Sequence, residues 1–196
     1  MHINIPNSLT ILRILLIPVL VAVFYIPFDH HLWVAAGIFA AAAVTDWFDG
    51  YLARRWQQVS ALGEFLDPVA DKLMVSTALV LILWAAPQHT MPFVPQHDMV
   101  LAVCAAIIIG REIVISALRE WMAELGERNA VAVTGIAKFK TIFQLVGVGA
   151  MLYTYPIFGI LPLYEFGFIF VVSAAVLTIW SMVIYLRAAW PSLNAE

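Results

Sequence analysis

Charged residues are scarce in this chain of 196 amino acids. Only 12% of its residues are Asp, Glu, Lys or Arg, whereas an ordinary soluble domain carries about 25%. Hydrophobic residues make up 63% of the chain, more than a compact soluble fold of this length can remove from water. The composition therefore excludes a soluble globular domain, a disordered chain and a collagen-like repeat. A membrane protein is the class that remains.

An excess of basic residues and a set of cysteines are also missing. Lys and Arg number 10 against 13 Asp and Glu, a net charge of −3. A nucleic-acid-binding protein would need a basic surface, so no nucleic-acid partner is expected. The single cysteine, Cys104, lies in an apolar run. One cysteine excludes an internal disulfide framework and a cysteine metal cluster.

Long apolar segments are abundant instead. A helix that crosses a hydrocarbon core of about 30 Å needs about 20 mostly apolar residues. Turn-forming and proline-rich stretches separate these segments, and none shows the alternation of a barrel strand. Six segments qualify, over residues 9–26, 32–54, 69–86, 99–121, 136–155 and 163–186. We expect an all-α polytopic membrane protein with six transmembrane helices, forming one domain over residues 1–196 with a short interfacial segment at about residues 1–8.

The basic residues predict how the chain is oriented. The connections at residues 27–31, 87–98 and 156–165 contain no Lys or Arg, so all 10 basic residues belong to the other side. Cytoplasmic loops carry the excess of Lys and Arg in membrane proteins. Both termini are therefore expected on the cytoplasmic face.

Acidic residues form two short helical patterns near that face. Asp46 and Asp49 have the spacing i, i+3 in the second segment, and Asp67 and Asp71 have the spacing i, i+4 at the start of the third. Each pair shares one helix face. Pro68 is expected in the first turn of the third helix, where a missing N–H is tolerated. Two such faces on consecutive antiparallel helices predict a cluster of four carboxylates just inside the cytoplasmic boundary.

A cluster of this kind favours divalent cations. Carboxylates that are close together and partly buried repel one another, and a divalent cation neutralises them. Oxygen ligands select Mg²⁺ or Mn²⁺ over Zn²⁺, and two ions on shared aspartates suit phosphoryl displacement. The alternative is an acidic cluster that only ends the helices. Three small residues near the cluster permit either a flat ligand or close helix packing: Gly50, Ala53 and Gly63.

A second group of residues is cationic. Arg111 follows an apolar run, so its side chain is expected to face the bundle or an aqueous cavity, with Glu112 as its partner or as a supporting group. Basic side chains at a pocket edge suit a phosphate-bearing ligand, and the alternative is anchoring at the membrane interface. The same alternatives hold for Arg119, Lys138 and Lys140. A polar stripe of Asn7, Thr10 and Arg13 either lies beside a nucleotide or anchors the chain at the interface.

Residues Asp46 to Asp71 match the pattern D-x2-D-G-x2-A-R-x8-G-x3-D-x3-D without a gap. In this pattern the chain resembles the CDP-alcohol phosphotransferase family of integral membrane enzymes, and the resemblance extends over the whole chain. Residues 4–13, 111–119 and 138–144 are similar to those of bacterial members that use glycerol-3-phosphate as the acceptor. The resemblance implies that a phosphatidyl group is transferred from CDP-diacylglycerol to glycerol-3-phosphate, with release of CMP.

The same resemblance implies roles for individual residues. Asp71 would be the general base. The cofactor would be Mg²⁺ or Mn²⁺, with two ions held by Asp46, Asp49, Asp67 and Asp71. The CDP-lipid would lie against Thr10, Asp46, Gly50, Ala53, Arg54 and Gly63, and the acceptor phosphate against Arg111, Arg119, Lys138 and Lys140. The resemblance also implies a homodimer in the bacterial inner membrane, with the active site facing the cytoplasm.

Two other functions remain open. The first is the same chemistry with another acceptor, such as inositol phosphate; a free serine acceptor would not need several cations. The second is a divalent-cation transporter that uses intramembrane carboxylates. A transporter would be expected to carry carboxylates near the midplane and an inverted repeat. In this sequence the acidic residues lie towards one face, and the second half has no matching pair.

Overall fold

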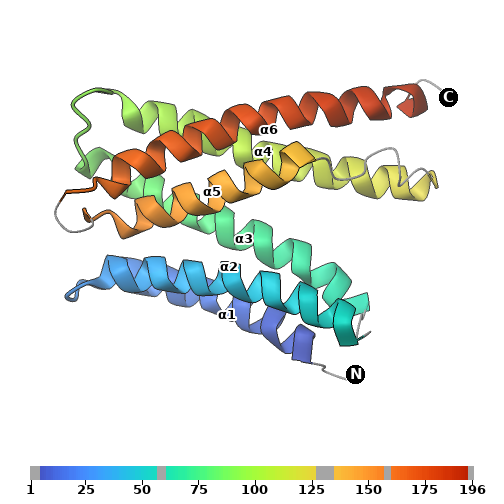
Figure 1. Cartoon of the computed structure of the whole chain (residues 1–196), viewed down its shortest axis with the longest axis horizontal. Coiled ribbons are helices and arrows are strands. Elements are labelled where there is room, and N and C mark those ends of the chain that lie inside the picture. The colour runs from blue at the N-terminus through green and yellow to red at the C-terminus, as the bar shows by residue number, and fades with distance from the viewer. Residues whose placement is uncertain (1–4, 57–60, 127–134, 157–159, 194–196) are drawn as a thin grey trace.

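The computed structural model describes residues 5–56, 61–126, 135–156 and 160–193 (Figure 1). Six helices account for most of these residues, as the sequence predicted. They are α1 (Ile5–Tyr25), α2 (His31–Trp56), α3 (Ala61–Ala85), α4 (His97–Glu124), α5 (Gly135–Tyr153) and α6 (Leu163–Leu193), with a short 3₁₀ helix η1 (Ala86–Gln88) after α3.

The helices have the length and composition of membrane spans. Four contain stretches long and apolar enough to cross a bilayer, at Asn7–Tyr25, Phe65–Gln88, His97–Glu124 and Leu163–Pro191. The remaining two contain shorter apolar stretches, His31–Asp46 and Phe139–Tyr153. These stretches confirm the prediction of an all-α membrane protein.

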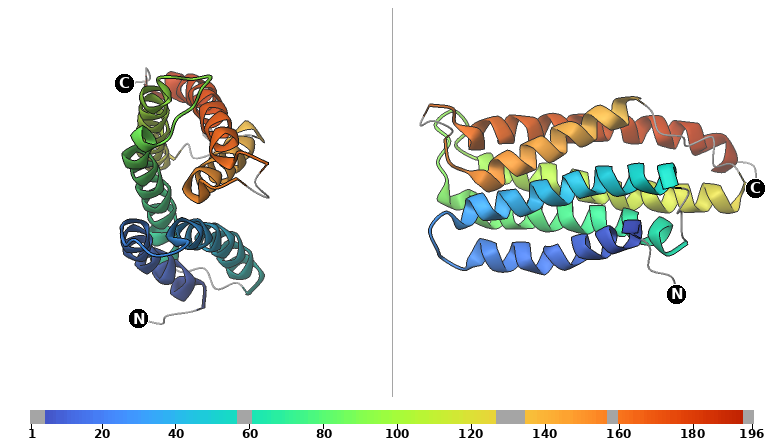
Figure 2. Two further views of the ribbon diagram at one scale, coloured as in Figure 1. Left: turned by 90° about the vertical axis from the view of Figure 1, so that its left-hand side faces the viewer. Right: turned by 60° about the horizontal axis from the view of Figure 1, so that its bottom comes forward.

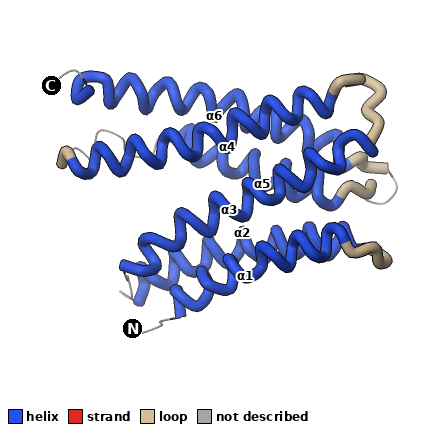
Figure 3. The backbone as a smooth tube through the Cα atoms, turned by 180° about the vertical axis from the view of Figure 1, so that it is seen from behind, coloured by secondary structure: helices blue, strands red, loops and turns tan. Residues whose placement is uncertain are grey.

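The bundle has two distinct ends. The start of α1 and the end of α6 lie at one end, here called the terminal end (Figure 1). The connections after α1, α3 and α5 lie at the opposite end, here called the loop end, where most of the described loop residues gather (Figure 3). This arrangement agrees with an even number of spans.

Neighbouring helices are arranged in two groups. The pair α1 and α2 lies on one side of the bundle, with α4 and α6 on the other, and α3 and α5 contact both groups (Figure 2). Buried apolar side chains such as Phe39, Leu79 and Val171 fill the interior. Large apolar side chains such as Val80 and Trp180 remain exposed on the outer faces, as expected of surfaces that contact lipid.

The helix boundaries differ from the prediction, most clearly in α3. This helix begins at Ala61 and not near residue 69, so Pro68 lies inside it and not in its first turn. The sequence prediction followed apolar residues, and Glu64 and Asp67 interrupt them. Backbone hydrogen bonding nevertheless continues past the apolar stretch, so the helix extends beyond the part suited to hydrocarbon. At its far end α4 stops where Gly126 adopts a left-handed φ of 77°, a common way for a helix to end.

Aromatic and imidazole side chains gather at the loop end. Trp33 stacks on Tyr153 with ring centroids 5.5 Å apart, and His89 stacks on Tyr164 at 4.3 Å. Burial lowers the pKa of His89, nearby His97 lowers it further, and Glu165 partly opposes both effects. Aromatic rings are typical of the boundary between hydrocarbon and headgroups, so this end is suited to a membrane interface.

Candidate active site

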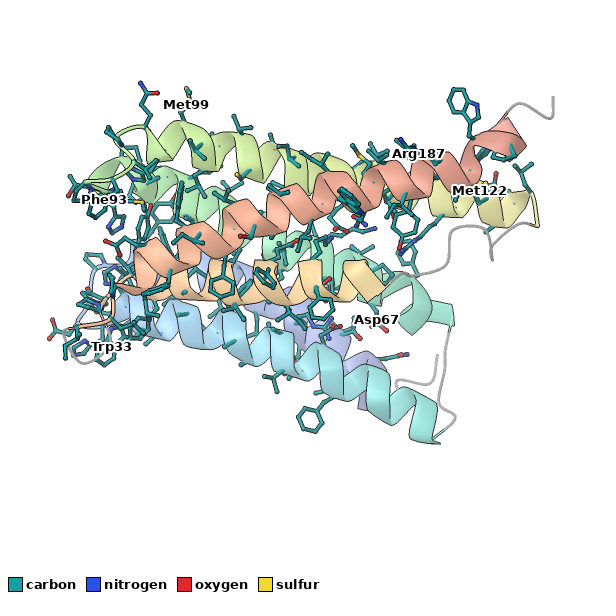
Figure 4. All side chains as sticks on the ribbon, turned by 45° about the horizontal axis from the view of Figure 1, so that its top comes forward. Trp33, Asp67, Phe93, Met99, Met122 and Arg187 are labelled. Atoms are coloured by element: carbon teal, nitrogen blue, oxygen red, sulfur yellow. The ribbon has the colours of Figure 1, made fainter. Side chains whose placement is uncertain are left out.

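The acidic residues on α2 and α3 meet side chains from α1. Asp46 and Asp71 both form ion pairs with the same nitrogen, Arg13 Nη1, at 2.7 Å and 2.9 Å, and Asp71 also accepts a hydrogen bond from it. One turn earlier on α1, the Thr10 hydroxyl donates to Asp67 at 2.5 Å. Asp67 lies towards the terminal end, far from Trp33 at the loop end (Figure 4). The structure thus brings three of the four predicted carboxylate positions to one region.

The polar stripe on α1 belongs to this region. Asn7, Thr10 and Arg13 are 3%, 1% and 1% exposed. Buried charges need partners, and the arginine has them in the two aspartates. The stripe is therefore buried and does not form an exposed interfacial anchor, and Thr10 and Arg13 lie against the carboxylates.

The carboxylates offer the oxygen ligands that a hard divalent cation prefers. Asp46 and Asp71 already share one positively charged nitrogen, so their oxygens are close enough to share a cation. Both side chains are partly exposed, at 38% and 51%. Among the side chains that the structure describes, no group of three His, Cys, Asp or Glu residues is arranged to hold a metal ion. The complete set of ligands stays a prediction.

Several predicted site residues lie in described helices, but their own contacts and burial fall outside what the structure describes. They are Asp49, Gly50, Ala53 and Arg54 on α2 and Lys138 on α5. Gly63 is described, and it is buried in α3.

The cationic residues meet on the facing helices α4 and α5. Arg111 and Lys140, only 6% and 5% exposed, both pair with the carboxylate oxygen Glu112 Oε1. Arg111 Nη1 lies 3.0 Å from that oxygen, and Lys140 Nζ contacts the same atom. Glu112 is therefore a direct partner of Arg111 and a bridge to Lys140, which decides between the alternatives that the sequence left open.

Helix α6 supports the two arginines. Arg111 Nη2 donates to Ser181 Oγ at 3.2 Å, and Arg119 Nη2 donates to the Tyr185 hydroxyl at 3.1 Å. The guanidinium carbons of Arg111 and Arg119 lie 5.6 Å and 5.2 Å from the centroid of the Tyr185 ring, within the range of cation–π attraction. The ring of Tyr185 thus contacts both cations at once.

One cavity of about 860 Å³ joins the acidic and cationic groups. This volume is within the range of small-molecule and cofactor sites. Its walls carry carboxylates, cations and deeper apolar side chains, so it offers separate surfaces for a polar headgroup and for hydrocarbon. The charged residues along it are Arg13, Asp46, Asp71, Lys72, Arg111, Glu112, Arg119 and Lys140.

Sequence reasoning missed Lys72, which lines this cavity, and Ser181 and Tyr185, which contact two of its arginines. Lys72 Nζ donates to Ser116 Oγ at 2.5 Å and so joins α3 to α4 between the acidic and cationic groups. Ser181 and Tyr185 lie in an apolar segment that showed no sign of a site. The spacing between Ser181 and Tyr185, one helical turn, was the only available signal, and it is too common to be informative.

Comparison with known proteins places the chain among enzymes of one kind. A family model described as CDP-alcohol phosphatidyltransferase matches residues 3–180. A protein of Haemophilus influenzae is 48% identical over 98% of this chain and 97% of its own length. One of Pseudomonas fluorescens is 48% identical over 98% and 93%, and one of Salmonella choleraesuis is 50% identical over 96% of each. Each of these relatives is named CDP-diacylglycerol–glycerol-3-phosphate 3-phosphatidyltransferase.

Proposed function

The chain belongs to the CDP-alcohol phosphatidyltransferase family, and we propose that it transfers the phosphatidyl group of CDP-diacylglycerol to glycerol-3-phosphate. The products are phosphatidylglycerophosphate and CMP. The observation that carries this proposal is the near full-length similarity to relatives named for this reaction, at 48% and 50% identity. The cavity supports it, because its carboxylates and cations suit a pyrophosphate donor and a phosphate-bearing acceptor.

In the proposed reaction Asp71 acts as the general base. The 1-hydroxyl of glycerol-3-phosphate is a weak nucleophile at neutral pH, and a carboxylate within reach can take its proton. The hydroxyl oxygen then bonds to the phosphorus that carries diacylglycerol. The bond between that phosphorus and the bridging oxygen of the pyrophosphate breaks, and CMP leaves with that oxygen. Asp71 suits this role because it lines the cavity and half of its side chain is exposed, at 51%.

The acidic region would also hold the divalent ions on which the family generally depends. We propose Asp46, Asp49, Asp67 and Asp71 as the ligands, with Mg²⁺ or Mn²⁺ as the metal and two ions in the site. Bound there, the ions would supply positive charge to the pyrophosphate and to the departing phosphate. Arg13 forms ion pairs with Asp46 and Asp71, and Thr10 donates a hydrogen bond to Asp67, so these two side chains hold three of the carboxylates in place.

The donor and acceptor would occupy different parts of the cavity. We propose that the CDP-lipid lies in the region of Thr10, Asp46, Gly50, Ala53, Arg54 and Gly63. The acceptor phosphate would lie against the cations Arg111, Arg119, Lys138 and Lys140, of which Arg111, Arg119 and Lys140 line the cavity. Arginine in particular suits the planar, multidentate recognition of phosphate.

The substrates also suggest where the enzyme works. The donor keeps its acyl chains in the bilayer, whereas CMP and glycerol-3-phosphate are soluble, so the reaction needs a site near a membrane boundary. The cavity's charged residues lie towards the terminal end, and the positive-inside rule assigns that end to the cytoplasm. We propose a homodimer in the bacterial inner membrane with its active site facing the cytoplasm.

A turnover assay tests the proposed function. Purified protein is incubated with CDP-diacylglycerol, Mg²⁺ and one acceptor at a time, and CMP release is measured. We expect release with glycerol-3-phosphate and not with serine or without an acceptor. Inositol phosphate is the informative competitor, because it also carries a phosphate. CMP release with inositol phosphate and not with glycerol-3-phosphate would contradict the proposed acceptor and identify inositol phosphate in its place.

The substitution Asp71→Asn tests the general base. It preserves the shape of the side chain and removes its ability to take a proton, so CMP release should fall at least about 100-fold, within the range for general-base catalysis. Asp98→Asn is the matched control, because Asp98 is an exposed residue in the first turn of α4 at the loop end. Unchanged release in Asp71→Asn would contradict the assignment of Asp71.

A further inference from the structure

Two nearly buried cations in the cavity share a single carboxylate. Arg111 and Lys140 are 6% and 5% exposed, and both contact Oε1 of Glu112, whose side chain is 25% exposed. Both cations and Glu112 line the cavity. Among the ion pairs of the described residues, Glu112 is the carboxylate that serves these two cations. One negative charge therefore already offsets part of their positive charge in the protein without an acceptor.

The neighbouring arginine is arranged differently. Arg119 also lines the cavity, and it is held by a neutral group, the Tyr185 hydroxyl, at 3.1 Å. Its charge thus remains available to an anion, whereas the charges of Arg111 and Lys140 are partly satisfied. Among the described cations that line the cavity, Arg119 and Lys72 are hydrogen-bonded to neutral hydroxyls, whereas Arg111 and Lys140 pair with Glu112.

An arriving phosphate must compete with Glu112. A phosphate that binds Arg111 and Lys140 would bring its charge close to the carboxylate that those side chains already contact, and like charges in a partly buried site repel. The lysine ammonium has three donors and the guanidinium five, so both can turn towards a new acceptor. The repulsion between the phosphate and the Glu112 carboxylate falls if the carboxylate moves away from the two cations.

We propose that Glu112 is an internal competitor of the acceptor's phosphate. In the acceptor-free site it holds Arg111 and Lys140 in place and prevents two unpaired charges from being buried. When the phosphate binds, Glu112 releases Lys140 and loosens its contact with Arg111. When the product leaves, Glu112 pairs with both cations again. This inference rests on the proposed function, because it concerns the acceptor region of the same cavity.

The competition would determine which acceptors can bind. A dianionic phosphate offers enough charge to displace a carboxylate, whereas a neutral hydroxyl compound does not. Glu112 would therefore increase the negative charge that an acceptor must carry in order to bind. It would also speed the release of a phosphate-bearing product. Glu112 is thus a specificity-determining residue whose removal should tighten binding and slow turnover.

The test is the substitution Glu112→Gln, which removes the charge and keeps a hydrogen-bond acceptor of the same shape. Inorganic phosphate is the probe, measured as a competitive inhibitor against glycerol-3-phosphate. We expect its Ki and the KM for glycerol-3-phosphate to fall about three- to tenfold, which corresponds to about 0.7–1.4 kcal/mol. The kcat should fall as well, because product release slows. The KM for CDP-diacylglycerol should not change.

Glu124→Gln is the matched control, since Glu124 is an exposed residue at the end of the same helix. All its constants should equal those of the unsubstituted protein. A rise in the phosphate Ki for Glu112→Gln would overturn the proposal, because it would show that Glu112 supports phosphate binding. An unchanged Ki would overturn it too. If the unsubstituted protein releases no CMP, the proposed function itself has failed, and this outcome is distinct from the other two.

A second measurement covers the case in which Glu112→Gln does not fold. Glu112→Asp keeps the charge and withdraws it by one methylene, so competition should weaken and the phosphate Ki should fall less than in the Gln variant. Thermal stabilisation by inorganic phosphate, followed in detergent, reports binding without turnover. Phosphate should shift the melting temperature of either variant more than that of the unsubstituted protein. A smaller or equal shift would refute the competition.

Discussion

At the scale of single residues, Tyr185 shows how an apolar helix contributes to a charged site. The side chain is 1% exposed, its hydroxyl accepts a hydrogen bond from Arg119, and its ring lies within 5.6 Å of both guanidinium carbons. Two like charges that approach the same region repel each other, and the attraction of both cations to one aromatic ring offsets part of this repulsion. Tyr185 therefore acts as a positioning residue for the arginines that would bind the acceptor.

Two substitutions of Tyr185 should weaken acceptor binding to different extents. Tyr185→Phe keeps the ring and loses the hydroxyl, so the KM for glycerol-3-phosphate should rise about two- to fivefold, the effect of one hydrogen bond. Tyr185→Leu also loses the ring, and the KM should rise at least about tenfold as two cation–π contacts disappear. The KM for CDP-diacylglycerol should remain constant in both variants.

Tyr155→Phe provides the matched control for this series, because Tyr155 is exposed at the loop end. It should leave both KM values unchanged. A purely structural role for Tyr185 would lower kcat or protein yield and move both KM values together. Equal changes in the two KM values would therefore contradict the positioning role.

Residue positions in the site were predictable where neighbours in the chain share a helix. The spacing of Asp67 and Asp71 placed them on one face, and the structure brings Asp71 and Asp46 to the same nitrogen. The partners of these residues were not predictable. Arg13 is 58 residues from Asp71, and Ser181 is 70 residues from Arg111. Spacing reports which residues share a helix face, and it carries no information about which helices pack together.

At the scale of helices, the contact between α5 and α6 depends on two glycines. A Cβ atom on Gly147 would lie 2.9 Å from the carbonyl oxygen of Gly167 and 2.9 Å from the backbone nitrogen of Val171. A Cβ on Gly167 would lie 2.8 Å from the carbonyl oxygen of Gly147. Backbone atoms cannot move aside as a flexible side chain can. The two helices therefore approach as closely as they do because both positions lack a side chain.

Gly147→Ala should destabilise the protein by about 1–3 kcal/mol, the usual effect of overpacking a tight contact. The measurement is thermal or denaturant unfolding in detergent. Gly37→Ala is the control, because a Cβ on Gly37 would meet nothing within 4 Å. Alanine is the better helix former, so the control should be neutral or stabilised by up to about 1 kcal/mol. Equal stability of the two variants would show that α5 and α6 can separate at little cost.

The number and type of helices could be predicted from the sequence, whereas their ends could not. Apolar runs identify the residues suited to hydrocarbon, and each predicted run overlaps one of the six observed helices, although three runs continue one or two residues past the helix end. The backbone hydrogen bonds do not stop where the apolar residues stop. In α3 the helix includes Glu64 and Asp67, and these polar turns lie where the site is built. Hydropathy therefore underestimates a membrane helix at the end that carries the chemistry.

At the scale of the whole molecule, the two ends of the bundle differ in charge. Residues 14–53, 73–110 and 141–186 contain no Lys or Arg, so the basic residues that the structure describes lie in the segments next to the terminal end. The loop end carries aromatic and imidazole side chains instead, such as Trp33 and His89. An asymmetry of this kind orients helical membrane proteins during insertion. It should place the cavity's charged residues next to the cytoplasm, where nucleotides and glycerol-3-phosphate are dissolved.

Cysteine labelling in intact cells tests this orientation. The chain has one native cysteine, Cys104, which is buried in α4 and can be replaced by alanine. In that background Thr90→Cys places a thiol at the loop end and Glu124→Cys places one at the terminal end, both at exposed positions. A membrane-impermeant maleimide should label Thr90→Cys in intact cells and should label Glu124→Cys only after the membrane is opened. The opposite pattern would place the cavity's charged residues on the outer face. Soluble substrates from the cytoplasm could not then reach them, so the labelling result also tests whether the proposed reaction is possible in the cell.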